Sequence, residues 1–481
     1  MSRRFLATSL FSLLIVPTYS RAQQTPPPPA APRAVRVSHP TERTLDNGLR
    51  VIVIEKTGLP LVAARLLVKS GAEMDSDDRG GLADMTASLL TKGTKTKSAE
   101  QIALGVEALG ATIDSGAGWD NSYVTLGALA DNFPQAMNYV ADVVLHPTFA
   151  QGEIERLRDQ NIDALRVAMQ NPSQLASFVA SRVLYGGAPY GHNQGGTPES
   201  LQKITRDDVV KFHQTYYRPD NAVLVVAGDV KSADVFAVAQ KLFGAWSHRV
   251  EAMPPAAFEK TPAAAQPHIV VVDMPEAGQA AVVVTRRGLE RTDPDYYKAI
   301  VSNAVLGAGY SSRLNQEIRI KRGLSYGAGS AFEFRRAAGP FSASVQTKNE
   351  SAVEVAGLIG GEINKMTSTS VPESELTPRK ATLIGDFGRS VETTLGLTAR
   401  LGGLVLYGLS LDEINAYVGN VQAVTPPEVQ KFSTEHLAGD ADIVIVGDMK
   451  KIGDALKKAY PNAEIIPLDQ LDLNSPTLRK K

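Results

Sequence analysis

Residues 204–230 read ITRDDVVKFHQTYYRPDNAVLVVAGDV, and residues 424–449 read VTPPEVQKFSTEHLAGDADIVIVGDM. In each stretch a helical pattern leads into a short β-branched run that ends in Gly-Asp. Asp229 and Asp448 close these two runs 219 residues apart. A spacing of this size indicates a duplicated domain, because solenoid repeats recur after only 20–50 residues.

The regions around the two stretches support the duplication. Each half opens with two strand-like runs: LRVIVIEK and VAARLLVKSG in the first half, HIVVVDMP and AAVVVTRRG in the second. Long helical patterns follow at 97–110, 132–145, 152–170, 293–306, 350–366 and 372–407. Because strands and helices intermingle in both halves, we expect an α+β fold made of two homologous domains. Each domain should be a mixed β-sheet with helices packed on one face.

The N-terminus has the form of a secretory signal peptide. Arg3 and Arg4 precede the short apolar run FLATSLFSLLIV, and a small-residue cleavage site ends at Ala22. The run is too short to span a membrane, so we expect an exported protein, periplasmic and without stable membrane insertion, rather than one held by an uncleaved anchor. The expected segments are a signal peptide (1–22), a Pro-rich leader (23–39), a first domain (40–248), a linker (249–267), a second domain (268–465) and a tail (466–481).

Composition excludes several classes of partner. The signal segment holds three arginines and no acid, so the mature chain keeps 47 of the 50 basic residues against 51 acidic ones, a net charge of about −4. A mildly acidic, well-mixed chain argues against nucleic acid or an anionic membrane as the main partner. The sequence contains no cysteine, which excludes disulfides and a thiol nucleophile.

No self-sufficient active site is visible in the sequence. The seven histidines lie at 39, 146, 192, 213, 248, 268 and 436, and no two of them are within five residues. A local pair of imidazoles for a metal therefore cannot form. No G-x-S-x-G, P-loop or cysteine nucleophile is present, and GAGSAFEF (327–334) lacks the Lys-Ser/Thr that a phosphate loop needs.

Five stretches in order carry a family resemblance. They are LDNGLRVIVIEK, GGLADMTASLLTKGT, LHPTFAQGEIERLRDQNIDAL, the run from APYGHNQGG to VAGDV, and LNQEIRIKRGLSYGAGSAFEF. With these, the mature chain resembles the pitrilysin/insulinase family of zinc peptidases, in the two-domain form related to mitochondrial processing peptidase. The resemblance implies that fold and a chamber between domains that admits peptides.

The resemblance also implies a zinc site whose ligands are missing here. The family's first helix carries H-x-x-E-H between Gly-Leu-Ala and Lys-Gly-Thr, where two histidines bind zinc and the glutamate activates water. The matching positions in this chain are Asp84, Ala87 and Ser88. A third ligand, a glutamate on a later helix, aligns with Ala164, and an acid seven residues earlier aligns with Leu157. We therefore expect no zinc in this chain, and we interpret Asp84 as a helix N-cap or an exposed polar residue.

A second set of family residues is present. In the family an arginine, and a tyrosine seven residues after it, reach the zinc site from across the chamber; Arg319 and Tyr326 in RIKRGLSY match that spacing. Tyrosine can donate to the oxyanion that forms at the scissile carbonyl, and arginine can hold a carbonyl or carboxylate. We expect Arg319 on the last turn of a helix and Tyr326 at the start of a strand, where macrodipole and packing roles are the alternatives. Arg322 and Arg313 are the competing arginines.

Together these features predict a zinc-free subunit. The resemblance implies a heterodimer in which a homologous subunit bears H-x-x-E-H and the zinc, and this chain supplies Arg319 and Tyr326 in trans. Substrates would be unfolded peptides added as a strand to a sheet edge of the zinc-bearing half. GATIDSGAGWDNSYVTLGAL (110–129) would be the structural counterpart of that edge here. The alternatives are a purely structural subunit and a peptide-binding module that uses the fold without hydrolysis.

Overall fold

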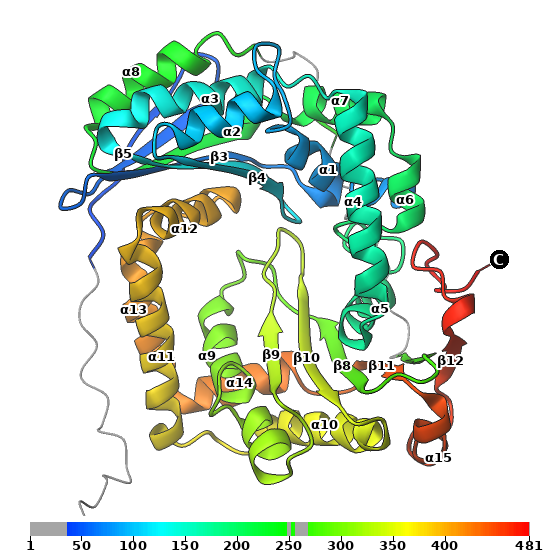
Figure 1. Ribbon diagram of the computed structural model, residues 1–481. Coiled ribbons are helices and arrows are strands. Elements are labelled where there is room, and N and C mark those ends of the chain that lie inside the picture. The colour runs from blue at the N-terminus through cyan, green and yellow to red at the C-terminus, as the bar shows by residue number, and fades with distance from the viewer. Residues whose placement is uncertain (1–35, 248–251, 255–267, 481) are drawn as a thin grey trace, which may run out of the picture.

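The computed structural model describes residues 36–247, 252–254 and 268–480. The predicted signal peptide and most of the predicted leader and linker lie outside the described residues. None of the helices in the described part is long and apolar enough to cross a membrane. Figure 1 shows two sheets, one above the other, with helices around both and between them.

The first half forms a six-stranded mixed sheet with strand order β1-β2-β6-β3-β5-β4. Helices α2, α3 and α8 cover its outer face, where they bury Leu66, Val124 and Phe236 in one core (Figure 1). The strands are β1 (Thr41–Thr44), β2 (Arg50–Glu55), β3 (Leu61–Val68), β4 (Thr112–Ala117), β5 (Ser122–Leu129) and β6 (Ala222–Gly228). The helices are α1 (Leu82–Leu89), α2 (Ala99–Glu107), α3 (Phe133–Leu145), α4 (Gln151–Met169), α5 (Pro172–Tyr185), α6 (Pro198–Lys203), α7 (Arg206–Tyr216) and α8 (Ser232–Phe243).

The second half repeats this plan with strand order β12-β7-β11-β8-β10-β9. Helices α9, α10 and α14 form the layer over one face of this sheet. The strands are β7 (Ile269–Asp273), β8 (Ala280–Arg287), β9 (Ala328–Phe332), β10 (Pro340–Thr347), β11 (Asp442–Gly447) and β12 (Glu464–Pro467). The helices are α9 (Tyr296–Leu306), α10 (Ala352–Ser368), α11 (Glu373–Glu392), α12 (Thr394–Leu406), α13 (Glu413–Ala423), α14 (Pro426–His436) and α15 (Met449–Ala459).

The two duplicated stretches occupy equivalent places. Thr205 and Thr425 begin α7 and α14 with capping boxes, whose partners are Asp208 and Glu428. The strand that follows each helix lies inside its sheet: β6 pairs in parallel with β2 and antiparallel with β3, and β11 does the same with β7 and β8. The predicted fold of two homologous mixed sheets is therefore confirmed.

The two halves exchange one helix each, which the sequence did not indicate. Helix α5 of the first half packs on β8 and β11, and α12 of the second half packs on β3 and β6 (Figure 1). Leu401 of α12 belongs to the same core cluster as Val225 of β6, and Val179 of α5 belongs to the same cluster as Val283 of β8. Each sheet therefore has its own helices on one face and a helix from the other half on the opposite face.

The predicted helices differ from the observed ones mainly at their ends. The pattern at 372–407 gives two helices, because Thr393 is extended (φ −89°, ψ 147°) and its side chain accepts from the amide of Gly396 to begin α12. The expected boundary at 465 falls inside β12. Leu471, Leu473 and Leu478 of the predicted tail are buried against the second sheet.

Candidate functional site

Helix α1 is the counterpart of the helix that carries the zinc motif in the resemblance. Asp75, not Asp84, caps its start: the Asp75 carboxylate accepts from the amides of Gly81 and Ala83, both at 2.9 Å. Gly81 has φ +93°, and a Cβ there would lie 2.9 Å from the carbonyl oxygen of Gly195, so a glycine is required. The interpretation of Asp84 as the N-cap is wrong, because the cap comes from the loop before the helix.

The positions that would hold a zinc ion do not suit one. Burial raises the pKa of Asp84. The backbone amide of Ala117 on β4 donates to the Asp84 carboxylate, which offsets part of this rise. Ala87 is fully buried, Ser88 is half-buried and Ala164 is exposed on α4. One carboxylate and one hydroxyl cannot replace two imidazoles and a glutamate, so the residues present do not fit zinc.

Asp84 instead contributes to closing one end of the edge strand β4. Gly118 N donates to Asn121 O, so these two residues form a hydrogen-bonded pair at the end of the hairpin. Hydrogen-bonded and non-hydrogen-bonded pairs alternate along an antiparallel ladder, so the backbone groups of Ile113, Ser115 and Ala117 point away from β5. The amide of Ala117 faces the Asp84 carboxylate, and the carbonyl oxygen of Ala117 accepts from Gln194 Nε2 at 2.8 Å. The outward groups of Ala117 are therefore satisfied within the chain.

Arg319 lies in a short π-helical segment, Asn315–Lys321, before β9. Its guanidinium lies 4.9 Å from the ring centroid of Tyr310. Among the residues that the structure describes, it makes no ion pair. The competing arginines are engaged: Arg313 forms a bidentate pair with Glu375, and Arg322 pairs with Glu317 and Glu354.

Tyr326 is 90% exposed and lies two residues before β9 rather than at its first residue. It sits at the base of the β9–β10 hairpin. The tip of that hairpin, residues 333–339, is the part that meets the first half, where Arg336 N donates to Asp120 Oδ2 at 2.7 Å. A five-residue strand separates the base from the tip by about 17 Å. The structure therefore does not bring Tyr326 to α1 of the same chain.

The hairpin tip forms a polar junction that the sequence did not indicate. Asp120, 2% exposed in the β4–β5 turn, accepts from Tyr190 Oη at 2.5 Å and from Tyr407 Oη at 3.1 Å. Arg336 also lies 3.5 Å from Glu73, and burial and the nearby Asp120 raise the pKa of Glu73 to about 8. This Asp120 junction joins the first sheet, the hairpin and the end of α12. No sequence signal could have found it, because the residues that donate to Asp120 lie 70 to 287 residues from it.

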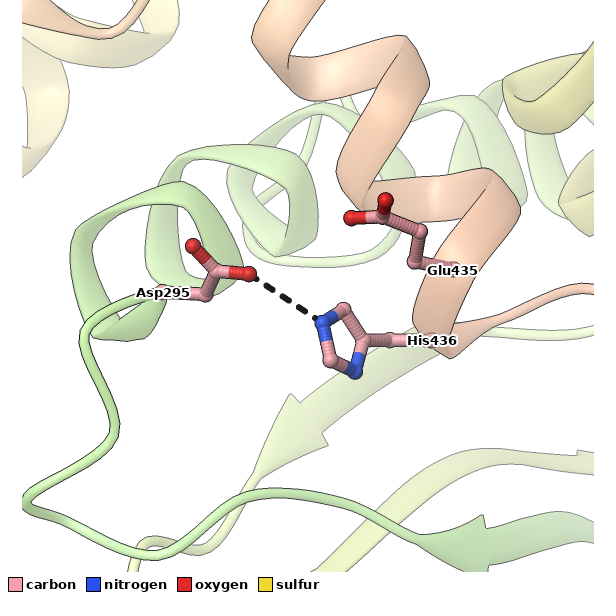
Figure 2. A group of neighbouring side chains, drawn as sticks. All are labelled: Asp295, Glu435 and His436. Atoms are coloured by element: carbon pink, nitrogen blue, oxygen red, sulfur yellow. Dashed lines mark hydrogen bonds and ion pairs between the residues drawn. The ribbon is translucent and has the colours of Figure 1, made fainter.

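One group of three metal-capable side chains occurs in the described part of the chain, away from α1. Figure 2 shows Asp295 at the start of α9 facing His436 and Glu435 at the end of α14. His436 Nε2 is 3.2 Å from Asp295 Oδ2, and Lys298 Nζ is 2.6 Å from Asp295 Oδ1. Burial opposes ionisation of Asp295, but the bonds from Lys298 and His436 lower its pKa. The group is accounted for as an ion-pair network between two helices.

Comparison with known proteins assigns the family. The profile described as "Insulinase (Peptidase family M16)" matches residues 50–191, and the one described as "Peptidase M16 inactive domain" matches residues 203–383. The chain belongs to the M16 peptidase family. Its M16 fold accounts for the duplicated sheets, and its first half carries α1 in the place of the zinc-binding helix.

Relatives of M16 type extend over nearly the whole chain. A protein of Mycobacterium tuberculosis named as an uncharacterized zinc protease is 26% identical over 88% of this chain and 96% of its own length. One of Bacillus subtilis with the same description is 24% identical over 84% of this chain and 97% of its own. The crystal structure of a peptidase M16 inactive domain from Pseudomonas fluorescens has a TM-score of 0.79 at 28% identity, covering 85% of this chain and 98% of that one. The chain is thus a member of a zinc-protease family.

Proposed function

We propose that this chain is the zinc-free subunit of an exported heterodimeric zinc metallopeptidase that acts on unfolded peptides. A homologous subunit bearing H-x-x-E-H would hold the zinc, and this chain would supply Arg319 and Tyr326. The observation that carries the proposal is the contrast between two sites. At α1 the zinc-motif positions hold Asp84, buried Ala87 and Ser88, whereas Arg319 is half-buried without an ion pair in the described part of the chain and Tyr326 is exposed.

Arg319 and Tyr326 can act on a substrate without first breaking an ion pair within the described part of this chain. An arginine that is held by a carboxylate in its own chain must break that bond before it can act on a substrate. Arg313 and Arg322 are held in this way, whereas no carboxylate of residues 36–247, 252–254 or 268–480 holds Arg319. Tyr326 buries almost none of its surface, so its hydroxyl can donate to an oxyanion in a second subunit. The distance of Tyr326 from α1 in the same chain is consistent with action in trans.

Substrate peptides would pair as an added strand with the sheet edge of the zinc-bearing subunit. In this chain they could not pair along the full length of the edge strand β4. A substrate strand needs a row of free backbone donors and acceptors at a sheet edge. In this chain Asp84 and Gln194 occupy the outward groups of Ala117. Export to the periplasm is proposed on the form of residues 1–22 alone.

Two measurements test the proposal. Affinity purification of the tagged chain should recover a protein of similar size that carries H-x-x-E-H and stoichiometric zinc, while the chain alone should contain no zinc and cut no unstructured peptide. In the reconstituted pair, Tyr326→Phe and Arg319→Ala should lower peptide cleavage by roughly 10- to 1,000-fold without changing assembly. Arg322→Ala is the matched control and should keep full activity.

The outcomes separate the competing functions. A clean homodimer, or equal rates for Arg319→Ala and wild type in the pair, would replace the proposal with a structural or peptide-binding role. Chelator-sensitive cleavage by the isolated chain would overturn the zinc-free assignment itself.

A further inference from the structure

Arg65 is a half-buried cation on the inner face of the first sheet, outside the site described above. Val62, Ala64 and Leu66 of β3 point into the core beneath α3 and α8, so the alternating residue Arg65 points to the opposite face. There its Cδ lies beside α12, 3.6 Å from the place where a Cβ of Gly402 would be. Arg65 therefore marks the border between the part of the sheet that α12 covers and the part that it leaves open.

The guanidinium of Arg65 stacks on the ring of Tyr123. Arg65 Cζ lies 4.2 Å from the ring centroid of Tyr123 on the neighbouring strand β5. Tyr123 in turn reaches over Gly116 of β4, where a Cβ would meet its hydroxyl at 2.8 Å. The planar guanidinium is thus stacked on a ring whose position depends on the absence of a side chain at Gly116.

Arg65 has no acceptor for its hydrogen-bond donors among the residues that the structure describes. The neighbouring groups that act on its charge are the Asp114 carboxylate and the Tyr123 hydroxyl, and neither is bonded to it. Buried charges in proteins are normally paired, and Arg291 and Arg313 of this chain follow that rule with Glu413 and Glu375. Burial also lowers the pKa of Arg65, which remains a cation at any physiological pH. A partly desolvated arginine fork without an acceptor among the described residues is suited to a planar anion.

The position of Arg65 relative to the edge of the sheet narrows the class of anion. Arg65 is opposite Thr125, and Thr125 is opposite Asp114 on the edge strand β4. Two strand spacings place Arg65 about 10 Å from the row of β4, where the outward backbone groups of Ile113 and Ser115 can pair with an extended chain. A peptide that pairs there can turn inward and reach Arg65 with its last residues.

We propose that Arg65, stacked on Tyr123, binds the C-terminal carboxylate of an unfolded peptide held inside the M16 fold. This inference rests on the proposed function in one respect, that the fold admits unfolded peptides. It assigns this chain a role in holding a peptide end, separate from what Arg319 and Tyr326 do at the partner's zinc. The same chemistry could recognise an internal acidic side chain, so the experiment compares the two sources of carboxylate.

The test is direct binding to the isolated full-length mature chain. Fluorescence polarisation would compare three labelled, unstructured decapeptides without other acids: one with a free C-terminus, one amidated, and one amidated with an internal glutamate. The free acid should bind at least about tenfold more tightly than the amide, as expected for a charge-assisted bidentate bond. Arg65→Gln should abolish this difference, and Arg65→Lys should retain part of it. Tight binding of the internal-glutamate peptide alone would overturn the assignment to a peptide end.

A matched control exists on the other face of the sheet. Arg43 is exposed and lies 4.6 Å from the ring centroid of Phe236. Arg43→Gln removes an aromatic-stacked arginine of the same kind and should leave the preference for the free acid unchanged. If Arg43→Gln and Arg65→Gln weaken binding equally, or if the wild-type chain does not distinguish acid from amide, the proposal is wrong.

A measurement without any substitution covers the case in which Arg65 variants fail to fold. Phenylglyoxal modifies free guanidinium groups, and mass spectrometry reports the modified arginine. The free-acid peptide should slow modification of Arg65 severalfold and the amide should not, while Arg43 should react equally in both. Equal modification of Arg65 in both samples would refute the site. These binding and modification experiments use no partner subunit. The Arg65 site can therefore be refuted while Arg319 and Tyr326 still act in the heterodimer, and it can be supported even if no heterodimer forms.

Discussion

Asp120 offers the sharpest test of how the two halves are joined. Its carboxylate accepts from the Tyr190 hydroxyl, the Tyr407 hydroxyl and the Arg336 amide, which belong to three separate segments. Asp120→Ala removes the acceptor for all three donors at once. Asp120→Asn keeps one oxygen, which can still face Arg336 N and Tyr407, while the Tyr190 hydroxyl can turn and accept from the new amide.

The size of the effect follows from burial. Tyr190 is 2% exposed, so the loss of its bond to a charged acceptor should cost about 2 kcal/mol. Tyr407 and Arg336 are half-buried, and water can replace their acceptor, so each should cost about 1 kcal/mol. Removing the Asp120 charge returns little through Glu73, because a pKa of about 8 keeps Glu73 mostly protonated, and so uncharged, at pH 7. We therefore expect Asp120→Ala to lower the free energy of unfolding by about 4 kcal/mol and Asp120→Asn by about half of that.

Urea unfolding at pH 7, followed by tryptophan fluorescence, measures these changes, and Trp119 contributes a signal from next to the junction. The ring centroid of Trp119 lies 5.5 Å from that of Tyr190. Tyr407→Phe should cost about 1 kcal/mol in the wild-type background and almost nothing in Asp120→Ala, because the bond is already lost. Asp131→Ala, at an exposed position, is the control. A cost below 1 kcal/mol for Asp120→Ala, or an undiminished cost of Tyr407→Phe in that background, would refute the reasoning.

Three further predictions concern other parts of the fold. Burial raises the pKa of Glu73 to about 8 from 4.5, so the folded chain holds a proton that the unfolded chain releases, and the free energy of unfolding should fall as pH rises from about 4.5 to 8. Glu73→Gln should flatten this fall in urea unfolding at pH 5, 6.5 and 8, and parallel curves would contradict it. Leu401→Ala, fully buried on α12, should lower the free energy of unfolding by about 3 kcal/mol, whereas Leu395→Ala, 48% exposed on the same helix, should change it by less than about 0.5 kcal/mol. Ala87→Glu should cost about 3 kcal/mol or prevent folding, because it buries an unpaired charge, while Ala164→Glu on the exposed face of α4 should be neutral in thermal melts; a fully stable Ala87→Glu would show that α1 still has an open site.

The fold could be predicted from the sequence because its signals are local and occur twice. The capping boxes at Thr205 and Thr425 and the β-branched runs after them specify a helix and a central strand in each half. These patterns extend over fewer than 30 residues, within the range that periodicity can resolve.

The parts that sequence reasoning missed depend on individual side-chain contacts, which hydrophobic periodicity does not encode. The cap of α1 comes from Asp75, six residues before Gly81, and the Asp120 junction needs Arg336 and Tyr407 from the second half. Arg65 is one polar residue in an apolar strand, and only the structure shows that the described residues offer it no hydrogen-bond acceptor. Arg313 and Arg322 differ from Arg319 in being paired with glutamates, and these ion pairs are visible only in the structure.

The exchange of α5 and α12 changes what counts as the smallest stable piece of this protein. A chain ending after α8 would leave the inner face of β3 and β6 without α12, and a chain starting at β7 would leave β8 and β11 without α5. Either fragment would expose a strip of valine, isoleucine and leucine to water. A protease cut between Pro254 and His268 would therefore yield two pieces that remain bound as a complex. In this respect the protein is a covalently linked dimer of two repeats, and its two halves are inseparable even though the duplication is plain in the sequence.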